Sequence, residues 1–74
     1  MNSEEYVQEL MLQLKYLYSN VDFKCVDQYG VYCIVGNNEE LIDSNAFLEW
    51  ESNVWSDFVS YFPCEGLYFK YEQF

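Results

Sequence analysis

Residues 21–36 have the sequence VDFKCVDQYGVYCIVG, in which two runs rich in apolar residues flank a turn signal. Asp27 and Gly30 suit the first and fourth positions of a type I turn. Gly30 can also adopt the left-handed conformation that closes a three-residue hairpin loop with a bulge. The stretch therefore predicts a β-hairpin.

The predicted loop fixes which residues of the hairpin lie opposite one another. It pairs Phe23 with Val35, Cys25 with Cys33 and Asp27 with Val31. Facing thiols could be bridged under oxidation, but packed, free cysteines are the default interpretation. The face expected to point into the core carries Phe23, Cys25, Val31, Cys33 and Val35, and the other face carries Lys24, Val26, Tyr32 and Ile34.

Residues 3–19 are predicted to form a helix before the hairpin. Asn2 or Ser3 can cap its start, and Asn2 with Glu5 forms a capping-box-like pair. Apolar residues recur along one face at the three- and four-residue spacing of a helix: Val7, Leu10, Leu14 and Leu17. The opposite face carries Glu5, Glu9, Leu12 and Tyr16. That face is either a contact stripe or, as is more common, a solvated surface with two incidental apolar residues.

The segment that follows the hairpin begins with a second turn signal at residues 36–38, Gly-Asn-Asn. Residues 39–43 are predicted to form a short strand, with Leu41 and Ile42 as its apolar residues. A shift of one residue in register would exchange which of these two points inward. Residues 43–45 then offer three successive N-cap candidates for another helix.

This second helix is predicted over residues 46–62, where polar residues fall on one narrow stripe. One long helix fits the pattern, and a break near Ser52 and Asn53 into two shorter helices fits it nearly as well. Pro63 cannot continue a helix and ends the segment. Apolar and polar residues alternate over residues 67–71, which predicts a final half-buried strand.

Together these elements predict a single α+β domain over residues 1–74. A small antiparallel sheet of three to four strands would pack against helices, in the order α-β-β-β-α-β. Residues expected in its core are Val7, Leu10, Leu14, Leu17, Phe23, Val35, Phe58 and Phe69.

Charge is the feature of the composition that bears most on function. The chain has 13 acidic residues against three lysines, with no arginine or histidine, and a net charge of −10. Disordered acidic chains have few aromatic residues, whereas 22% of this chain is aromatic and 51% hydrophobic, which indicates a folded domain. Such self-repulsion costs a compact domain stability, so we expect a compensating basic partner.

Catalysis and cofactor binding are not indicated. General acid–base catalysis at neutral pH most often uses histidine, which the chain lacks. Its paired carboxylates lie where charge is normally solvated, and a chain this short has little room for a substrate cleft. The three cysteines have no CxxC spacing for zinc, and residues 36–40 lack the ligand spacing of a calcium loop. We therefore expect no enzyme activity, no cofactor and no dedicated metal site.

The charge also excludes whole classes of ligand. Nucleic-acid backbones are bound by Lys and Arg, and anionic membranes attract basic segments, so both would be repelled. No apolar run reaches membrane-spanning length, and the acidic residues 1–5 do not resemble the basic start of a signal peptide. An odd number of cysteines argues against a secreted disulfide framework. A cytoplasmic location follows as the expectation.

A strongly basic protein surface is the expected partner, and a nucleic-acid-binding protein offers one. Carboxylates can occupy a groove lined with Lys and Arg in place of nucleic acid. The chain resembles small acidic anti-CRISPR and anti-restriction proteins of phages, in size, charge and aromatic content only. The alternative is a small acidic interaction module or a homodimeric scaffold with no link to nucleic-acid sites, since acidic surfaces also favour solubility.

Partner-binding residues are expected on the first helix and the turns, with exposed tyrosines as apolar anchors. A small core also makes a homodimer plausible. The carboxylates chosen are Glu5, Glu9, Asp27, Glu39, Glu40 and Asp43, and the tyrosines are Tyr16, Tyr29 and Tyr68.

Overall fold

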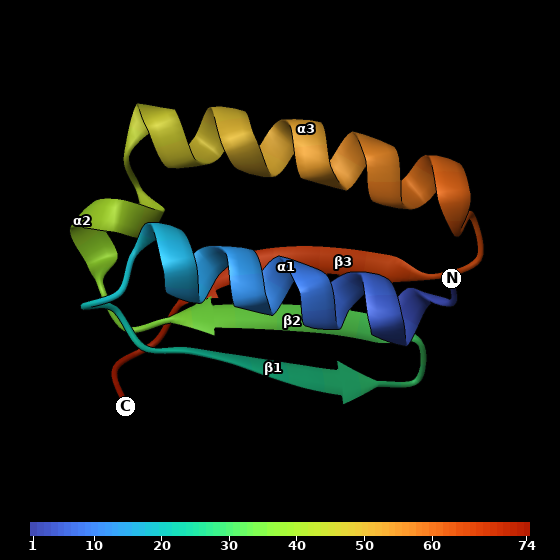
Figure 1. Cartoon of the computed structure of the whole chain (residues 1–74), viewed down its shortest axis with the longest axis horizontal. Coiled ribbons are helices and arrows are strands. Elements are labelled where there is room, and N and C mark those ends of the chain that lie inside the picture. Colours follow the sequence, from blue (N-terminus) through green and yellow to red (C-terminus); the bar gives the residue numbers. More distant parts are fainter.

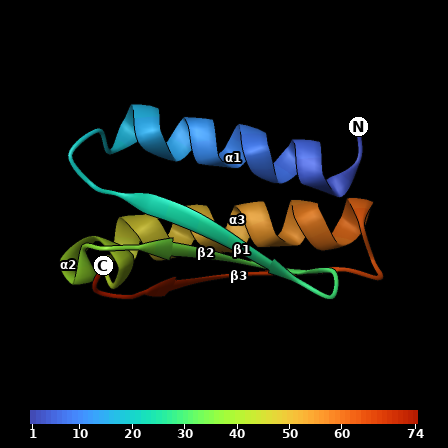
Figure 2. The ribbon, with the colours of Figure 1, turned by 90° about the horizontal axis from the view of Figure 1, so that it is seen from below.

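A computed structural model describes all 74 residues and has an α+β fold, as predicted. Its elements, in chain order, are α1 (Ser3–Leu17), β1 (Phe23–Gln28), β2 (Val31–Gly36), α2 (Glu39–Ile42), α3 (Asn45–Tyr61) and β3 (Gly66–Tyr71). The two long helices lie on the same face of the three-stranded sheet (Figures 1 and 2). No helix covers the opposite face, so the molecule has two layers.

The sheet is mixed, which corrects the prediction that it is antiparallel. Its strand order is β1-β2-β3; β1 pairs with β2 in antiparallel and β2 with β3 in parallel orientation. Parallel neighbours need a long crossover connection. α3 provides it, because this helix carries the chain back along the length of the sheet before β3 begins (Figure 1). The order of elements matches the prediction except at residues 39–42, where a helix replaces the third strand.

The strand predicted at residues 39–43 is wrong, because Glu39–Ile42 form the short helix α2. The Asn38 side chain caps this helix, with its Oδ1 accepting a hydrogen bond from the Leu41 N–H at 2.9 Å. Glu39 and Glu40 lie in the first turn, where the helix dipole favours negative charge. The sequence NEEL therefore combines two helix-start signals that outweigh the weak strand pattern.

The predicted hairpin exists, but its register is shifted by one residue. Gln28 pairs with Val31, so the loop has two residues, Tyr29 and Gly30, with φ angles of 57° and 78°. Two positive φ angles indicate a type I′ turn, whose twist matches that of the strands. Cys25 consequently pairs with Ile34 and not with Cys33. The three cysteines are free thiols.

The observed register divides the strand residues between two faces, because successive side chains alternate. The face under the helices, here called the covered face, carries Phe23, Cys25, Asp27, Tyr32, Ile34, Gly36, Leu67, Phe69 and Tyr71. The other, here called the open face, carries Lys24, Val26, Gln28, Val31, Cys33, Val35, Gly66, Tyr68 and Lys70. Of the predicted inward set, only Phe23 and Cys25 lie on the covered face.

A cluster of 11 buried residues forms the core between the covered face and the helices. Five predicted core residues belong to it: Val7, Leu10, Leu14, Phe23 and Phe58. Phe69 is partly buried against the cluster, and Val35 is buried on the open face. The prediction that Leu17 is buried is wrong, because α1 ends at this residue and its side chain is 54% exposed.

The starts of both long helices are capped as the sequence indicates. Asn2 Oδ1 accepts a hydrogen bond from the Glu5 N–H at 2.8 Å, and Ser44 Oγ accepts one from the Phe47 N–H at 3.2 Å. α3 is one continuous helix, which decides between the two alternatives for residues 46–62. Ser3 also anchors α1, because its buried Oγ lies 3.0 Å from the Tyr32 hydroxyl and donates to Glu65 Oε1 at 2.7 Å.

Candidate partner-binding surface

Almost all of the negative charge of this protein is uncompensated. Glu72 is the one carboxylate that forms ion pairs, with Lys24 Nζ and Lys70 Nζ, both at 3.6 Å. The other 12 of the 13 carboxylates have no lysine nitrogen within 4.0 Å. Lys15, on α1, forms no ion pair. The acidic helical side therefore has one lysine, and none of its carboxylates lies within ion-pair distance of it.

The first group of predicted contact residues lies along the outer side of α1. Glu5, Glu9, Leu12 and Tyr16 follow one another at helical spacing, opposite the buried Val7, Leu10 and Leu14. All four are exposed. This α1 stripe (Glu5, Glu9, Leu12 and Tyr16) thus presents carboxylates near the start of the helix and two large apolar side chains near its end.

A second group lies at the end of the molecule where α2 is found (Figure 1). Asn37, Asn38, Glu39, Glu40 and Asp43 line an open hollow with no apolar side chain, here called the α2 corner. The Asp22 N–H donates a hydrogen bond to Asn37 Oδ1 at 3.0 Å, which brings a further carboxylate beside it. The structure therefore gathers Glu39, Glu40 and Asp43 into one acidic site.

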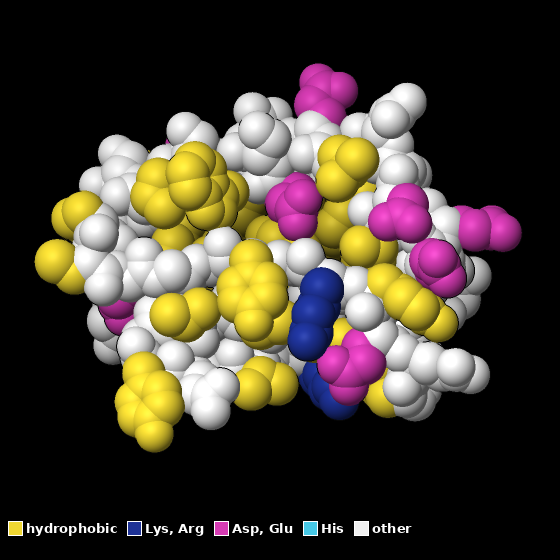
Figure 3. Space-filling model, turned by 180° about the vertical axis from the view of Figure 1, so that it is seen from behind, with side chains coloured by type: hydrophobic (Ala, Val, Ile, Leu, Met, Phe, Trp, Pro, Cys, Tyr) yellow, Lys and Arg dark blue, Asp and Glu magenta, His cyan; other side chains and the backbone are white.

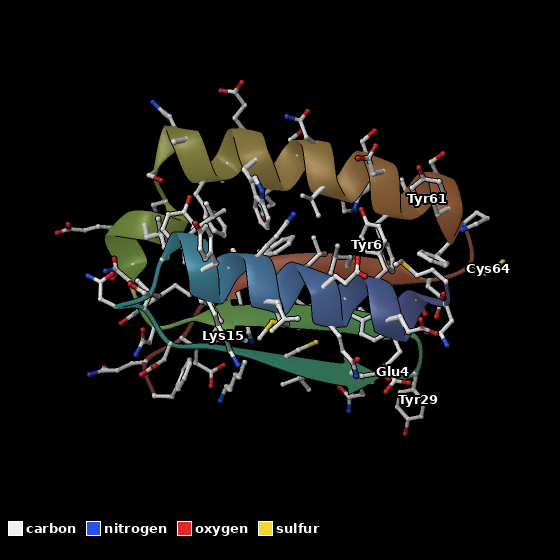
Figure 4. The ribbon with its side chains drawn as sticks, viewed as in Figure 1. Glu4, Tyr6, Lys15, Tyr29, Tyr61 and Cys64 are labelled. Atoms are coloured by element: carbon white, nitrogen blue, oxygen red, sulfur yellow. The ribbon has the colours of Figure 1, made fainter.

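A third group lies at the opposite end of the molecule, around the hairpin loop. Asp27 and Glu4 line a shallow hollow together with Cys25. Burial, followed by the negative charge of Asp27, raises the pKa of the Cys25 thiol. Tyr29, at the loop itself, projects away from the ribbon (Figure 4). Glu65 is near this end as well, hydrogen-bonded to Ser3.

Tyr29 combines strain with exposure. A φ of 57° is uncommon for a residue with a bulky side chain and disfavours it by roughly 1–2 kcal/mol. The side chain is nevertheless 98% exposed and takes part in no aromatic contact within the chain. Strained residues without an internal role are candidates for a function outside the chain.

The nine predicted contact residues do not form one compact site. The Cα atoms of the protein span 30 × 23 × 19 Å, and the hairpin loop and α2 lie at opposite ends of the longest direction (Figure 1). The α1 stripe runs between these ends. Tyr68 belongs to the open face, away from the helices that carry most of the other residues. The other eight predicted contact residues thus border the helical side of the molecule, and Tyr68 lies apart from them.

The open face contains contact residues that sequence reasoning did not select. Exposed Val26 and Val31 surround the buried Cys33, while Lys24 and Lys70 flank Val35 and are joined by Glu72. Lys24 Nζ also lies 4.5 Å from the centre of the Phe74 ring. Figure 3 shows the two lysines beside a carboxylate, surrounded by apolar side chains. A prediction with the observed hairpin register would have placed these residues together on one exposed face.

Two titratable groups near the helices are perturbed by their surroundings. Burial raises the pKa of the Tyr6 hydroxyl, and the charge of Asp57 raises it further. Tyr6 packs edge-on against Phe58 and Phe62, with ring centres 5.8 Å apart in both pairs, and lies close to Tyr61 (Figure 4). Burial also raises the pKa of Glu51 on α3.

Comparison with protein-family models, with curated proteins and with solved structures finds no match. None of the helices combines the length and the apolar content needed to cross a membrane. No three His, Cys, Asp or Glu side chains converge in a way that could hold a metal ion. The interpretation of the surface therefore rests on its geometry and charge.

Proposed function

We propose that this protein is a non-enzymatic inhibitor that places its acidic helical side against a basic, nucleic-acid-binding surface of a protein partner. The observation that carries the proposal is the set of 12 carboxylates without a cation partner. A domain that retains so much unneutralised charge is destabilised by it, and a basic partner removes that cost on binding. A cytoplasmic location, where the three free thiols remain reduced, is part of the proposal.

The arrangement of the carboxylates supports a groove as the partner site. The α2 corner and the group around the hairpin loop lie at opposite ends of the longest direction of the molecule (Figure 1). Glu5 and Glu9 of the α1 stripe extend the second group along the half of α1 nearest the hairpin loop. An elongated series of negative charges suits an elongated series of Lys and Arg side chains, such as one that follows a nucleic-acid backbone. The protein would occupy that groove in place of the nucleic acid.

Exposed aromatic and apolar side chains support a protein partner over a diffuse counterion cloud. Leu12 and Tyr16 extend the α1 stripe, and Tyr29 is held in solvent at the cost of backbone strain. Tyrosine is enriched at protein interfaces because its ring is apolar while its hydroxyl remains hydrated. These side chains would fix the position of the acidic surface in the groove.

The test is capture of a partner on the immobilised protein, followed by elution with rising salt. The expected partner also binds DNA or RNA, is released as salt screens the charges, and loses its nucleic acid in direct competition with this protein. A partner that holds this protein and its nucleic acid together, with no mutual effect on affinity, would contradict the proposal. That result would favour an acidic interaction module with no link to nucleic-acid sites.

Two matched variants then locate the contact. Glu9→Lys reverses a charge in the α1 stripe, and Glu49→Lys makes the same change on α3, at an exposed position outside the three acidic groups. Glu9→Lys should slow association with the partner several-fold and change dissociation less, because steering acts mainly on encounter. An equal slowing by both variants would show that only the net charge matters and that the α1 stripe is not the contact.

A further inference from the structure

The half of the open face nearest the hairpin loop, with the neighbouring part of α3, carries an exposed apolar patch. Val26, Val31, Tyr68 and Trp55 are each between 42% and 49% exposed. Trp55 and Tyr68 border a hollow of about 330 Å³ whose lining also includes Leu67, Phe69 and the polar Glu51 and Ser52. Figure 3 shows apolar side chains on this side of the molecule, separated in places by polar atoms. An exposed apolar patch on a soluble domain usually marks an interaction site.

Charge separates this face from the rest of the surface. Lys24 and Lys70 are its cations, and Glu72 forms ion pairs with both. Glu51 lines the hollow at the edge of the patch, so two cations stand beside two carboxylates here. The other side of the molecule carries the α1 stripe, and the α2 corner lies at one end, level with the sheet (Figure 2). Unpaired carboxylates predominate in both. Two copies of this chain would therefore repel one another if they met by their helical sides. The open face is the surface through which they can approach with the least repulsion.

We propose that the open face is the interface of a homodimer, with a second copy of this chain as its occupant. The same patch would be used by both copies, as in a two-fold symmetric interface. Two sheets would pack face to face about 10 Å apart, with Val26, Val31 and Tyr68 of each copy in the contact. Lys24 and Lys70 would keep Glu72 neutralised near the contact.

The size of the face limits the strength of this assembly. Three strands of six residues cover roughly 20 × 14 Å, about 280 Å² of sheet, and a standard interface buries roughly 800 Å² of each partner. The neighbouring part of α3 enlarges the contact, and we expect a weak dimer. The acidic helical sides would point outward from such a dimer. Dimerisation is thus independent of the proposed inhibitory function and leaves its surface free on both copies.

The test is sedimentation equilibrium of the full chain between about 1 μM and about 500 μM, since assembly follows mass action. We expect a monomer–dimer equilibrium that tightens when salt is raised from about 0.05 M to 0.5 M, because screening removes repulsion between the two acidic copies. A complex held by acidic-to-basic contacts weakens under the same change. The salt response therefore separates failure of this proposal from failure of the proposed function.

A matched pair of variants identifies the face. Val26→Glu places a carboxylate in the patch, and Leu12→Glu makes a similar change at an exposed apolar position of the α1 stripe. Val26→Glu should weaken dimerisation more than about tenfold, because each copy would bury a charge, while Leu12→Glu should leave it nearly unchanged. Circular dichroism checks that both variants remain folded.

The proposal is overturned if the parent protein stays monomeric across the concentration and salt ranges. It is also overturned if Leu12→Glu disrupts a dimer that Val26→Glu leaves intact, since the interface would then lie on the helical side. Either result would leave the open face to a partner of different chemistry.

Discussion

The two faces of the sheet are built from the same three six-residue strands, yet their side chains differ in how far they are buried. On the covered face, Tyr32, Ile34 and Leu67 are buried against the helices. On the open face, only Cys33 and Val35 are buried, and the surrounding valines, tyrosine and lysines reach solvent. Alternation along a strand therefore separates stabilising residues from residues available for contact.

Charge follows the same division. Two of the three lysines lie on the open face and share Glu72, while the unpaired carboxylates are concentrated on the helices, on α2 and near the hairpin loop. The protein thus offers two kinds of contact surface, one acidic and one apolar, on opposite sides of one small core. The consequence is that substitutions should affect stability, acidic contacts or self-association separately, according to the face that they change.

The largest expected effect separates the inner and outer sides of α1. Leu14 is 0% exposed within the core cluster, whereas Leu12 is 67% exposed two residues earlier. Leu14→Ala should lower the free energy of unfolding by about 2–5 kcal/mol, because it leaves a cavity. Leu12→Ala should change it by less than about 0.5 kcal/mol, as exposed substitutions usually do. Urea denaturation followed by circular dichroism measures both.

For a domain of this size, a loss as large as that of Leu14→Ala would leave much of the protein unfolded. If the two alanine variants had equal midpoints of denaturation, the division of α1 into a buried and a contact side would be wrong.

A second comparison tests the two faces of the sheet with a single methyl group. A Cβ added at Gly36, on the covered face, would lie 2.9 Å from Phe23 Cε1 and 3.0 Å from Ile42 Cδ1. One added at Gly66, on the open face, would lie 3.5 Å from the side chain of Val31, an ordinary contact. Gly36→Ala should therefore destabilise the protein by about 1–3 kcal/mol through overpacking.

Gly66→Ala is the control, and its melting temperature should equal or slightly exceed that of the parent, because alanine restricts the unfolded chain more than glycine does. An equal loss of stability in both variants would indicate that the open face is as tightly packed as the covered face. The contrast drawn here between the two faces would then be wrong.

The elements with strong local signals were the ones that sequence alone could predict. The period of Val7, Leu10 and Leu14 fixed α1, and the apolar runs around residues 27–30 fixed the existence of the hairpin. The register was missed because it depends on Tyr29 adopting a positive φ, which the identity of the residue disfavours. The parallel pairing of β3 depends on where α3 returns the chain, a tertiary property.

The candidate surface was predictable residue by residue but not as an arrangement. Exposure of Glu5, Glu9 and Tyr16 followed from the helical period of α1. The gathering of Glu39, Glu40 and Asp43 depends on α2 being a helix. The open face was missed because a shift of one residue in the hairpin register exchanges every side chain between the two faces.

A substitution in the loop that joins β1 to β2 should stabilise the protein, by less than the core substitutions destabilise it. Asn is favoured before Gly in type I′ turns, because it tolerates a positive φ far better than Tyr. Tyr29→Asn should therefore raise the free energy of unfolding by about 0.5–1 kcal/mol. The same variant should weaken binding to the basic partner if Tyr29 anchors it. Thermal melts and binding assays on one preparation test both, and a less stable variant would contradict the strain at this residue.

The smallest expected effect concerns Glu51, which lies at the edge of the hollow formed by Trp55 and Tyr68. Burial raises the pKa of Glu51, so its ionised form destabilises the folded state at neutral pH. That penalty is absent below the pKa of the carboxyl in the unfolded chain and develops as the pH rises through the higher pKa of the folded state. Glu51→Gln should therefore raise the melting temperature of a dilute sample at pH 7.

The gain from Glu51→Gln should shrink as the pH is lowered through the range in which Glu51 takes up its proton. Glu49→Gln, which removes the same charge from an exposed position of the same helix, is the matched control. It relieves long-range repulsion without removing a buried carboxylate, so its gain should be the smaller of the two at pH 7. Equal gains across the pH range would mean that net charge alone governs stability, and that burial beside the open face contributes nothing.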